Sequence, residues 1–394
     1  MHNDRSRLIL LLAAAFLLLA SCSANKLSLE DTLDKHAKSE DATKDHSKIM
    51  SNLPKKELPT AEITVSAVGD ILIHERVYKD AKVENGYDFR PMLESVSRYM
   101  DKTDISFANQ ETMIGGTEIG LSTYPVFNSP HEVGDVLKEA GVNIVSIANN
   151  HTLDRGEEAI RHAIGHWDRI GMAYVGAYRS ESDRDRVRVM ETDAGIAVAF
   201  LAYTYGTNGI PVPDGKDYLV NLIDKEMIAL EIEKAKKEAD AIIISLHFGN
   251  EYERMPSKEQ KELVQFAADE GVDVVLGTHP HVLQPVEWVE GKNGNQTLVA
   301  YSLGNFLSGQ AGLYRQIGGI LTFKIKKQAM KGEEKIWIHS PQFLITYNAS
   351  ENERNYRVLP MSEVTDAELS NARKIEGEIE EHMSQWMPEL QFID

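Results

Sequence analysis

The feature that most constrains the fold is a series of short apolar runs, rich in β-branched residues, that recur along the chain. They lie at residues 63–68, 104–108, 143–147, 196–202, 241–246, 272–276 and 297–301. Runs of this length and composition are typical of buried β-strands. Because helix signals separate several of them, the sequence predicts an α/β domain whose functional loops follow the carboxyl ends of parallel strands.

Helix boundaries are predicted by capping boxes and glycines. Ser129, Ser257 and Thr365 each stand three residues before a Glu or Gln, the spacing that satisfies two free backbone donors at a helix start. Gly141 and Gly271 lie where the first two of these helices are expected to end. The third helix is expected to run from Thr365 to about residue 385.

The N-terminus has the pattern of a secretory signal. Arg5 and Arg7 precede an apolar run at 8–20, which is short for a membrane span. The following Cys22, the single cysteine of the chain, completes a tetrapeptide that resembles a bacterial lipobox. That resemblance implies cleavage after residue 21, lipid on Cys22 and an extracytoplasmic location at the membrane. The alternative is a buried cysteine in an uncleaved anchor.

The rest of the chain divides by composition. Residues 22–60 are polar and end in two Leu-Pro pairs, which favours a flexible tether. Residues 61–348 are expected to form the functional domain, with two strands between 317 and 347, and residues 349–394 a C-terminal helical extension. The 42 Lys and Arg against 61 Asp and Glu give a formal charge of −19. This acidity excludes the electrostatic pattern of a nucleic-acid-binding protein.

Side chains that bind metals follow one predicted strand after another. They are Asp70, His74, Asn109, Glu111, Asn150, His151, His247, His279 and His281. Because parallel strands end at the same edge, we expect these loops to converge. Carboxylates, imidazoles and a carboxamide suit Mn, Fe or Zn, whereas Mg or Ca prefers an all-oxygen set.

Six ordered motifs resemble the CapA family, which is linked to poly-γ-glutamate capsule synthesis and is similar to calcineurin-like metallophosphoesterases. They are Val68-Gly69-Asp70, Asn109-Gln110-Glu111, Ala148-Asn149-Asn150-His151, Leu246 to Tyr252, Gly277 to Val282 and Tyr301 to Phe306. The resemblance implies a layered α-β-β-α domain. It also implies two divalent metal ions, bound by Asp70, Glu111, Asn150, His247, His279 and His281.

In that resemblance Asp70 and His281 hold one ion, Glu111 bridges, and the other three residues hold the second ion. His151 would be the general acid. Two departures from the wider phosphoesterase pattern are the longer bridging Glu111 and His74, which lies four residues from Asp70 rather than two.

Several of these residues have a second interpretation. His151 is also suited to a helix-capping loop, the 279–281 segment to a rigid surface turn, and His74 to a structural role. Arg155 is expected to contact an anionic substrate or to pair with Asp154. Glu251 is expected to orient His247, and Asn109 and Asn305 to support the site. His162 and His166 are four residues apart on a predicted helix, a spacing that also fits a zinc pair; their charged neighbours favour a solvated face.

Two classes of function fit this sequence. The first is a membrane-tethered, metal-dependent hydrolase or transferase that acts on a phosphoester or γ-glutamyl bond through activated water. The second is a non-catalytic accessory subunit of a membrane polymer synthase. A solvent-filled cleft at His151 would favour catalysis, and a cap formed by residues 205–218 would favour the accessory role. An anionic polymer such as poly-γ-glutamate is the expected partner of either.

Overall fold

The computed structural model describes residues 60–330 and 333–394. The expected signal peptide, Cys22 and nearly all of the expected tether lie outside these residues. In the described part of the chain, none of the helices has both the length and the apolar character that crossing a membrane requires.

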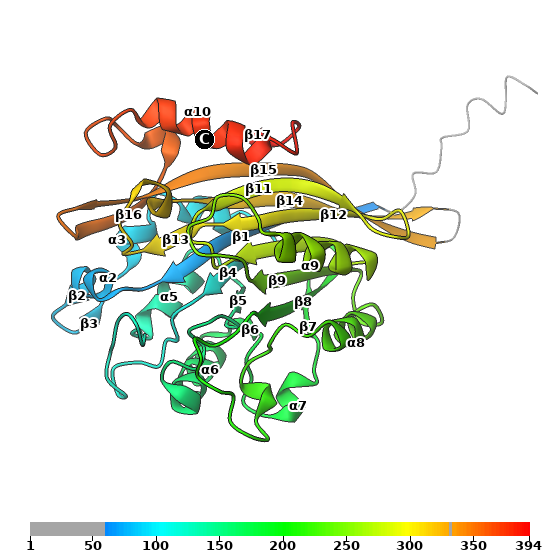
Figure 1. Cartoon of the computed structure of the whole chain (residues 1–394), viewed down its shortest axis with the longest axis horizontal. Helices are drawn as coiled ribbons and strands as arrows, with labels where there is room; N and C mark the ends of the chain where they lie inside the picture. The colour runs from blue at the N-terminus through cyan, green and yellow to red at the C-terminus, as the bar shows by residue number, and fades with distance from the viewer. Residues whose placement is uncertain (1–59, 331–332) are drawn as a thin grey trace, which may run out of the picture. The chain divides into compact units, whose positions relative to one another are not determined.

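Two β-sheets form the centre of the domain (Figure 1). The first has the order β16-β15-β14-β1-β4-β5-β6, with β13 beside β1 and β17 beside β15. Its strands are β1 (Thr60–Leu72), β4 (Ile105–Gln110), β5 (Ile144–Ser146), β6 (Ala173–Val175), β13 (Asn305–Ser308), β14 (Ile317–Met330), β15 (Glu333–Glu351), β16 (Arg354–Pro360) and β17 (Gln391–Phe392).

The second sheet has the order β11-β12-β10-β9-β8-β7. Its strands are β7 (Arg188–Glu191), β8 (Ala197–Thr204), β9 (Ala241–His247), β10 (Val274–Thr278), β11 (Leu283–Glu290) and β12 (Gln296–Leu303). A small separate hairpin pairs β2 (Lys82–Val83) with β3 (Gly86–Tyr87). The neighbours β1-β4-β5-β6 and β8-β9-β10-β12 are parallel within their sheets, as the alternation of strand and helix signals predicts.

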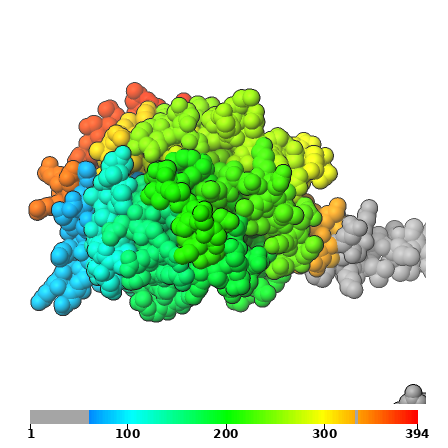
Figure 2. All heavy atoms as spheres, turned by 60° about the horizontal axis from the view of Figure 1, so that its bottom comes forward, coloured from blue at the N-terminus to red at the C-terminus, as the bar shows by residue number. Residues whose placement is uncertain are grey.

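Helices surround the two sheets, most of them on the outer faces, whereas the helix at Ala372–Ser384 packs Ile379 and Met383 into the apolar cluster between the sheets. They are α2 (Glu75–Asp80), α3 (Arg90–Leu93), α4 (Ser97–Asp101), α5 (Glu132–Glu139), α6 (Gly156–Ile170), α7 (Glu181–Arg184), α8 (Lys225–Ala235), α9 (Lys258–Asp269) and α10 (Ala372–Ser384), with short 3₁₀ turns at Asp217–Leu219, Leu313–Gln316 and Met361–Glu363. In Figure 2 the face turned toward the viewer consists mostly of the cyan and green segments, which include α6 and α7.

Three apolar clusters confirm the α-β-β-α layering. Between the sheets, Phe107 of β4 stacks on Phe200 of β8 with ring centroids 6.0 Å apart. On the outer face of the first sheet, Val145 packs in a cluster with Trp167 of α6. On the outer face of the second sheet, Ile244 belongs to the same buried cluster as Val264 of α9. Each sheet therefore buries both faces, which explains why its central strands are continuously apolar.

The predicted helix starts are right in one case and wrong in two. Ser257 and its Gln260 form the expected capping box at the start of α9. Helix α5 starts at Glu132 rather than after Ser129, because the Ser129 hydroxyl donates to Thr112 across the loop. Helix α10 starts at Ala372 rather than near Thr365, because Asn371 adopts a left-handed conformation that interrupts any helix there.

The expected boundary at residue 348 is also wrong. It falls inside β15, and the segment expected as a helical extension first adds β16 to the main sheet, with Tyr347 paired to Leu359. Only α10 within that segment is a regular α-helix. The two long strands predicted between 317 and 347 are present as β14 and β15.

Candidate metal centre

Asp70 lies at the carboxyl end of β1, where two other strands fix its backbone. It pairs with Asn109 of β4 on one side and with Asn305 of β13 on the other. A Cβ on the preceding Gly69 would collide with the carbonyl oxygen of Gly304, so only glycine allows β13 to approach this closely. In this motif Gly69 thus allows the close approach of the two strands, and Asp70 supplies the carboxylate.

The carboxylate of Asp70 is fully buried and held at both oxygens. The Asn109 side-chain amide donates to its Oδ1 at 2.9 Å, and Nδ1 of His281 donates to its Oδ2 at 3.0 Å. Burial by itself lowers the pKa of His281, but the carboxylates of Glu111 and Asp70 outweigh burial and raise that pKa to about 9. In the metal-free protein His281 and Asp70 are therefore an ion pair.

Glu111 is the central residue of the centre. It follows β4 and is fully buried, and neither of its carboxylate oxygens has a hydrogen-bond partner. Its Oε1 lies 3.7 Å from Nε2 of His247 and 3.7 Å from Nε2 of His281. Burial, with the nearby carboxylate of Asp70, raises the pKa of Glu111 well above its ordinary value. A buried carboxylate with no hydrogen-bond partner at either oxygen is the arrangement expected of a metal ligand.

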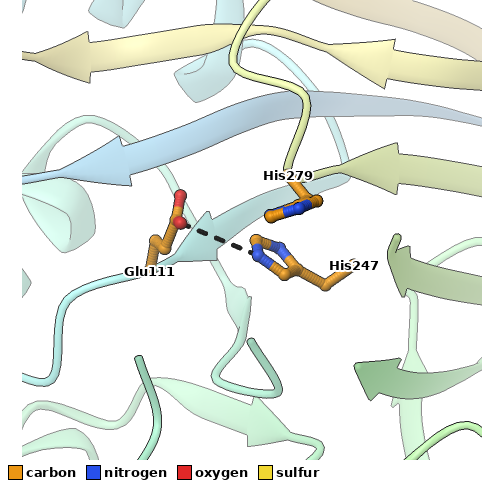
Figure 3. Close-up of side chains that lie close together, drawn as sticks. All are labelled: Glu111, His247 and His279. Atoms are coloured by element: carbon orange, nitrogen blue, oxygen red, sulfur yellow. Dashed lines mark ion pairs between the residues drawn. The ribbon is translucent and has the colours of Figure 1, made fainter. Parts of the chain in front are cut away.

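His247 and His279 face Glu111 from the second sheet (Figure 3). His247 ends β9, and the Thr278 hydroxyl lies 3.0 Å from its Nδ1. Its Nε2 lies 2.8 Å from the side-chain oxygen of Asn150, which follows β5. Burial lowers the pKa of both imidazoles, that of His279 to about 3, so both are neutral and able to ligate.

The segment 279–281 has an unusual backbone. His279 and His281 have φ angles of 96° and 59°, which non-glycine residues rarely adopt. Such conformations cost about 1–3 kcal/mol each and persist only where surrounding structure imposes them. Both side chains are buried, so this segment is part of the centre and the surface-turn interpretation is wrong.

The predicted ligands thus form two groups that share Glu111. Asp70, Glu111 and His281 each offer an atom within 4.8 Å of the others, and so do Glu111, His247 and His279. Asn150 adjoins the second group through His247. The unpaired Glu111 oxygens and the mixed nitrogen and oxygen donors fit divalent metal ions.

His151 lies beside the centre and is 6% exposed. Its Nδ1 donates to Asp154 at 2.7 Å, and its ring packs edge-on against Phe127 with centroids 4.7 Å apart. His74 packs against the same Phe127, and burial lowers its pKa to about 4. Its Nδ1 is paired with the Leu72 carbonyl at 3.1 Å.

The remaining predicted residues have varied positions. The Arg155 guanidinium does not pair with Asp154; it donates to the carbonyls of Ile119 and Gly120 and fixes that loop. Glu251 is exposed. Its carboxylate lies within 4.8 Å of ligand atoms of His279 and His281, whereas it was expected to orient His247. The Asn305 amide donates to Gln310 and to the Arg315 carbonyl and so shapes a loop.

Four residues that contact the site were not among the predicted site residues, although two of them, Tyr205 and Asn208, belong to the segment 205–218 that was considered as a cap. Asp154 orients His151, and the spacing of three residues between them was the available signal. Tyr205 lies with its ring centroid 4.6 Å from that of His279, and the Asn208 amide lies 3.3 Å from Nδ1 of His151. Phe127 contacts His151 from the loop between β4 and α5. No periodicity or spacing pointed to the last three.

Comparisons with known proteins identify the family of this chain. The chain matches the family described as "Bacterial capsule synthesis protein PGA_cap" over residues 64–310. It is 28% identical over 271 residues to the "PGA biosynthesis protein CapA" of Bacillus subtilis (strain 168), a match that covers 67% of this chain and 68% of that protein. It is 28% identical over 273 residues to the "Capsule biosynthesis protein CapA" of Bacillus anthracis, covering 65% and 62%.

Among solved structures, the calcineurin-like phosphoesterase YfkN from Bacillus subtilis aligns with a TM-score of 0.39 and 15% sequence identity, covering 72% of this chain and 91% of that one. The α-β-β-α fold of the present chain is assigned from its own layers and strand order.

Proposed function

Since the chain belongs to the PGA_cap family of bacterial capsule synthesis proteins, we propose that it is a divalent-metal-dependent hydrolase or transferase of capsule polymer synthesis. The observation that carries this proposal is the buried Glu111, which two groups of ligands share and whose oxygens have no partner. The matched segment spans only about two thirds of the length of these curated relatives, so the activity of this chain is our proposal.

The residues that would hold the metal are divided between the two sheets. Asp70 and His281 would bind one ion, Asn150, His247 and His279 the other, and Glu111 both. Mn, Fe or Zn bound there would polarise a phosphoryl or carbonyl oxygen and lower the pKa of water toward neutrality. The Asn109 amide would keep Asp70 in place, since it already donates to that carboxylate.

His151 is the residue best placed to move a proton. Asp154 accepts its Nδ1–H, which fixes the ring and directs Nε2 away from Asp154, so that Nε2 is free to serve a leaving group. The edge-on contact with Phe127 restricts the ring further. A histidine held in this way, next to the ligand Asn150, is what a general acid requires.

The surroundings bear on the two candidate functions differently. A cavity of about 490 Å³ is lined by Tyr205 and Phe248–Asn250, which adjoin His279 and His247 along the fold, and it would give room to part of a bound substrate beside the centre. Tyr205 and Asn208, however, lie against His279 and His151 and cover part of the site. That contact favours the second candidate, an accessory subunit of a membrane polymer synthase.

Substrate and location complete the proposal. The formal charge of −19 would repel an anionic polymer such as poly-γ-glutamate. Bound metal ions would therefore have to supply the positive charge that attracts it. Lipid on Cys22 would hold the domain outside the cytoplasm at the membrane, near a polymer synthase.

The test combines metal analysis of the purified protein with turnover of phosphoesters and γ-glutamyl polymer. His151→Gln should retain the metal and lose turnover about 10²–10⁴-fold, because only proton transfer is removed. His339→Gln, a change on the distant strand β15, is the control and should behave as wild type. Full turnover in His151→Gln would contradict the catalytic assignment, and metal retention without any turnover in wild type would favour the accessory role.

A further inference from the structure

A second group of potential metal ligands lies outside the centre described above. Glu118 belongs to the loop after β4, His131 precedes α5, and His162 lies within α6. Each offers one ligand atom within 4.8 Å of the others. The two histidines are half-buried and the glutamate is exposed, so solvent and ions reach the group.

His162 is oriented as metal-bound histidines are. Its Nδ1 lies 3.1 Å from the carbonyl oxygen of Gly115 and donates to it. That hydrogen bond places the proton on Nδ1 and leaves the Nε2 lone pair free. Metal-binding histidines commonly donate their other ring nitrogen to a backbone carbonyl, which fixes both the tautomer and the ring orientation.

His131 is fixed by stacking rather than by a hydrogen bond. Its ring lies parallel to that of His166, with centroids 4.6 Å apart and an interplanar angle of 9°. His166 is in turn held by Asp135 at 2.8 Å and is 3% exposed, so it does not lie on the solvated face expected from the sequence. The residue that lies close to His162 is thus His131, and not His166, whose spacing along the helix had offered a zinc pair as the less favoured alternative.

Glycine at position 116 allows the carboxylate and the imidazole to lie side by side against the backbone. Gly116 has a φ of 83°, and a Cβ there would collide with Oε2 of Glu118 and with the Cε1–Nδ1 edge of His131. Both polar atoms therefore line the same side of the Gly116 backbone. Burial and the neighbouring His166 lower the pKa of His131, so the imidazole is neutral at neutral pH.

We propose that Glu118, His131 and His162 form a separate divalent metal site, of the kind that takes Zn²⁺. Two imidazole nitrogens and one carboxylate oxygen are ordinary zinc ligands, and water completes the tetrahedron. Ligand atoms around zinc lie about 3.4 Å apart when bonds are about 2.1 Å, so the present spacing needs only small side-chain rotations.

The site would fix the loop that covers the centre. The loop between Glu118 and His131 carries Phe127, which contacts the rings of both His74 and His151. Arg155 already holds one end of this loop through the Ile119 carbonyl. A zinc ion would connect the loop to α5 and α6, and so restrict the position of Phe127.

Equilibrium dialysis of the full chain against Zn²⁺ tests the site. Glu118→Gln and His162→Gln should each lose one bound equivalent relative to wild type or bind it at least tenfold more weakly, whereas the control His339→Gln should not. Glu118 is exposed, so Glu118→Gln should fold normally, which an unchanged zinc-free melting temperature would verify. His247→Ala should keep this equivalent, which separates the site from the proposed metal centre.

Hydrogen exchange provides the second measurement. Zn²⁺ should slow amide exchange in residues 117–128 of wild type, and it should have no such effect in Glu118→Gln. Wild-type zinc stoichiometry and affinity in both variants would overturn the proposal. So would equal zinc-induced protection of this loop in wild type and Glu118→Gln.

Discussion

Replacing the central carboxylate by its amide, Glu111→Gln, separates metal binding from folding. Glu111 is buried with both oxygens unpaired, and burial holds its pKa well above the ordinary value. The metal-free protein therefore gains little from the charged form, and the isosteric amide should leave its melting temperature unchanged or raise it. Metal binding should suffer, because Glu111 belongs to both groups of ligands.

The magnitude follows from linkage between binding and unfolding. At a metal concentration 100 times the dissociation constant, binding stabilises the wild type by about 2.7 kcal/mol. Loss of a shared ligand should weaken binding at least about 100-fold, a larger effect than loss of a residue that only orients a ligand. At the same metal concentration the variant would then gain about 0.4 kcal/mol.

Differential scanning calorimetry with and without Mn²⁺ measures the difference. At about 2 °C per kcal/mol, the wild type should gain about 5 °C and Glu111→Gln about 1 °C or less. Glu290→Gln, on an exposed position of β11, is the matched control and should gain as much as wild type. A full metal-induced shift in Glu111→Gln would refute the shared-ligand geometry.

Three further changes follow from the same structure. His247→Ala removes a ligand that also holds Asn150, so equilibrium dialysis should show metal affinity reduced at least about tenfold; unchanged uptake would exclude the proposed centre. Asp154→Asn should reduce turnover while metal content is kept, because only the orientation of His151 is lost, and unaltered kcat would contradict this. Burial opposes ionisation of Asp183, but the Arg179 backbone N–H and the Arg186 side chain outweigh it and lower its pKa to about 2. Asp183→Asn should therefore cost about 2 kcal/mol at pH 7, a penalty present above about pH 4 that urea unfolding should find shrinking as the pH falls toward 2.

The ligands themselves could be predicted from the sequence because each follows a strand. Asp70, Glu111, Asn150, His247 and His281 stand directly after, or at the end of, short apolar runs, and parallel strands bring such positions to one edge. The steric role of Gly69, by contrast, depends on the distant Gly304, and only the tertiary structure shows it and the positive φ of His279. The local sequence pattern was sufficient to predict the ligands because each ligand is close in the chain to the strand that positions it.

Helix starts were predicted less well, because residues outside the capping motif decide where each helix begins. Thr365 does contact Glu368 as its spacing predicts, but the turn does not continue because Asn371 is left-handed. The Ser129 hydroxyl is taken by Thr112, which is distant in sequence. In each case a contact or conformation outside the four-residue motif decided the outcome.

The sequence by itself determined which side chains could bind metal and that strands would present them in loops. Only the tertiary structure decided that these loops come from two stacked sheets, so that Glu111 of the first sheet faces His247 and His279 of the second. It alone also decided that Asn208 and Phe127 lie against His151, that Tyr205 lies against His279, and that His131, not His166, lies against His162. These contacts join segments far apart in the chain, and no local periodicity encodes the distance between two segments that meet only when both sheets pack.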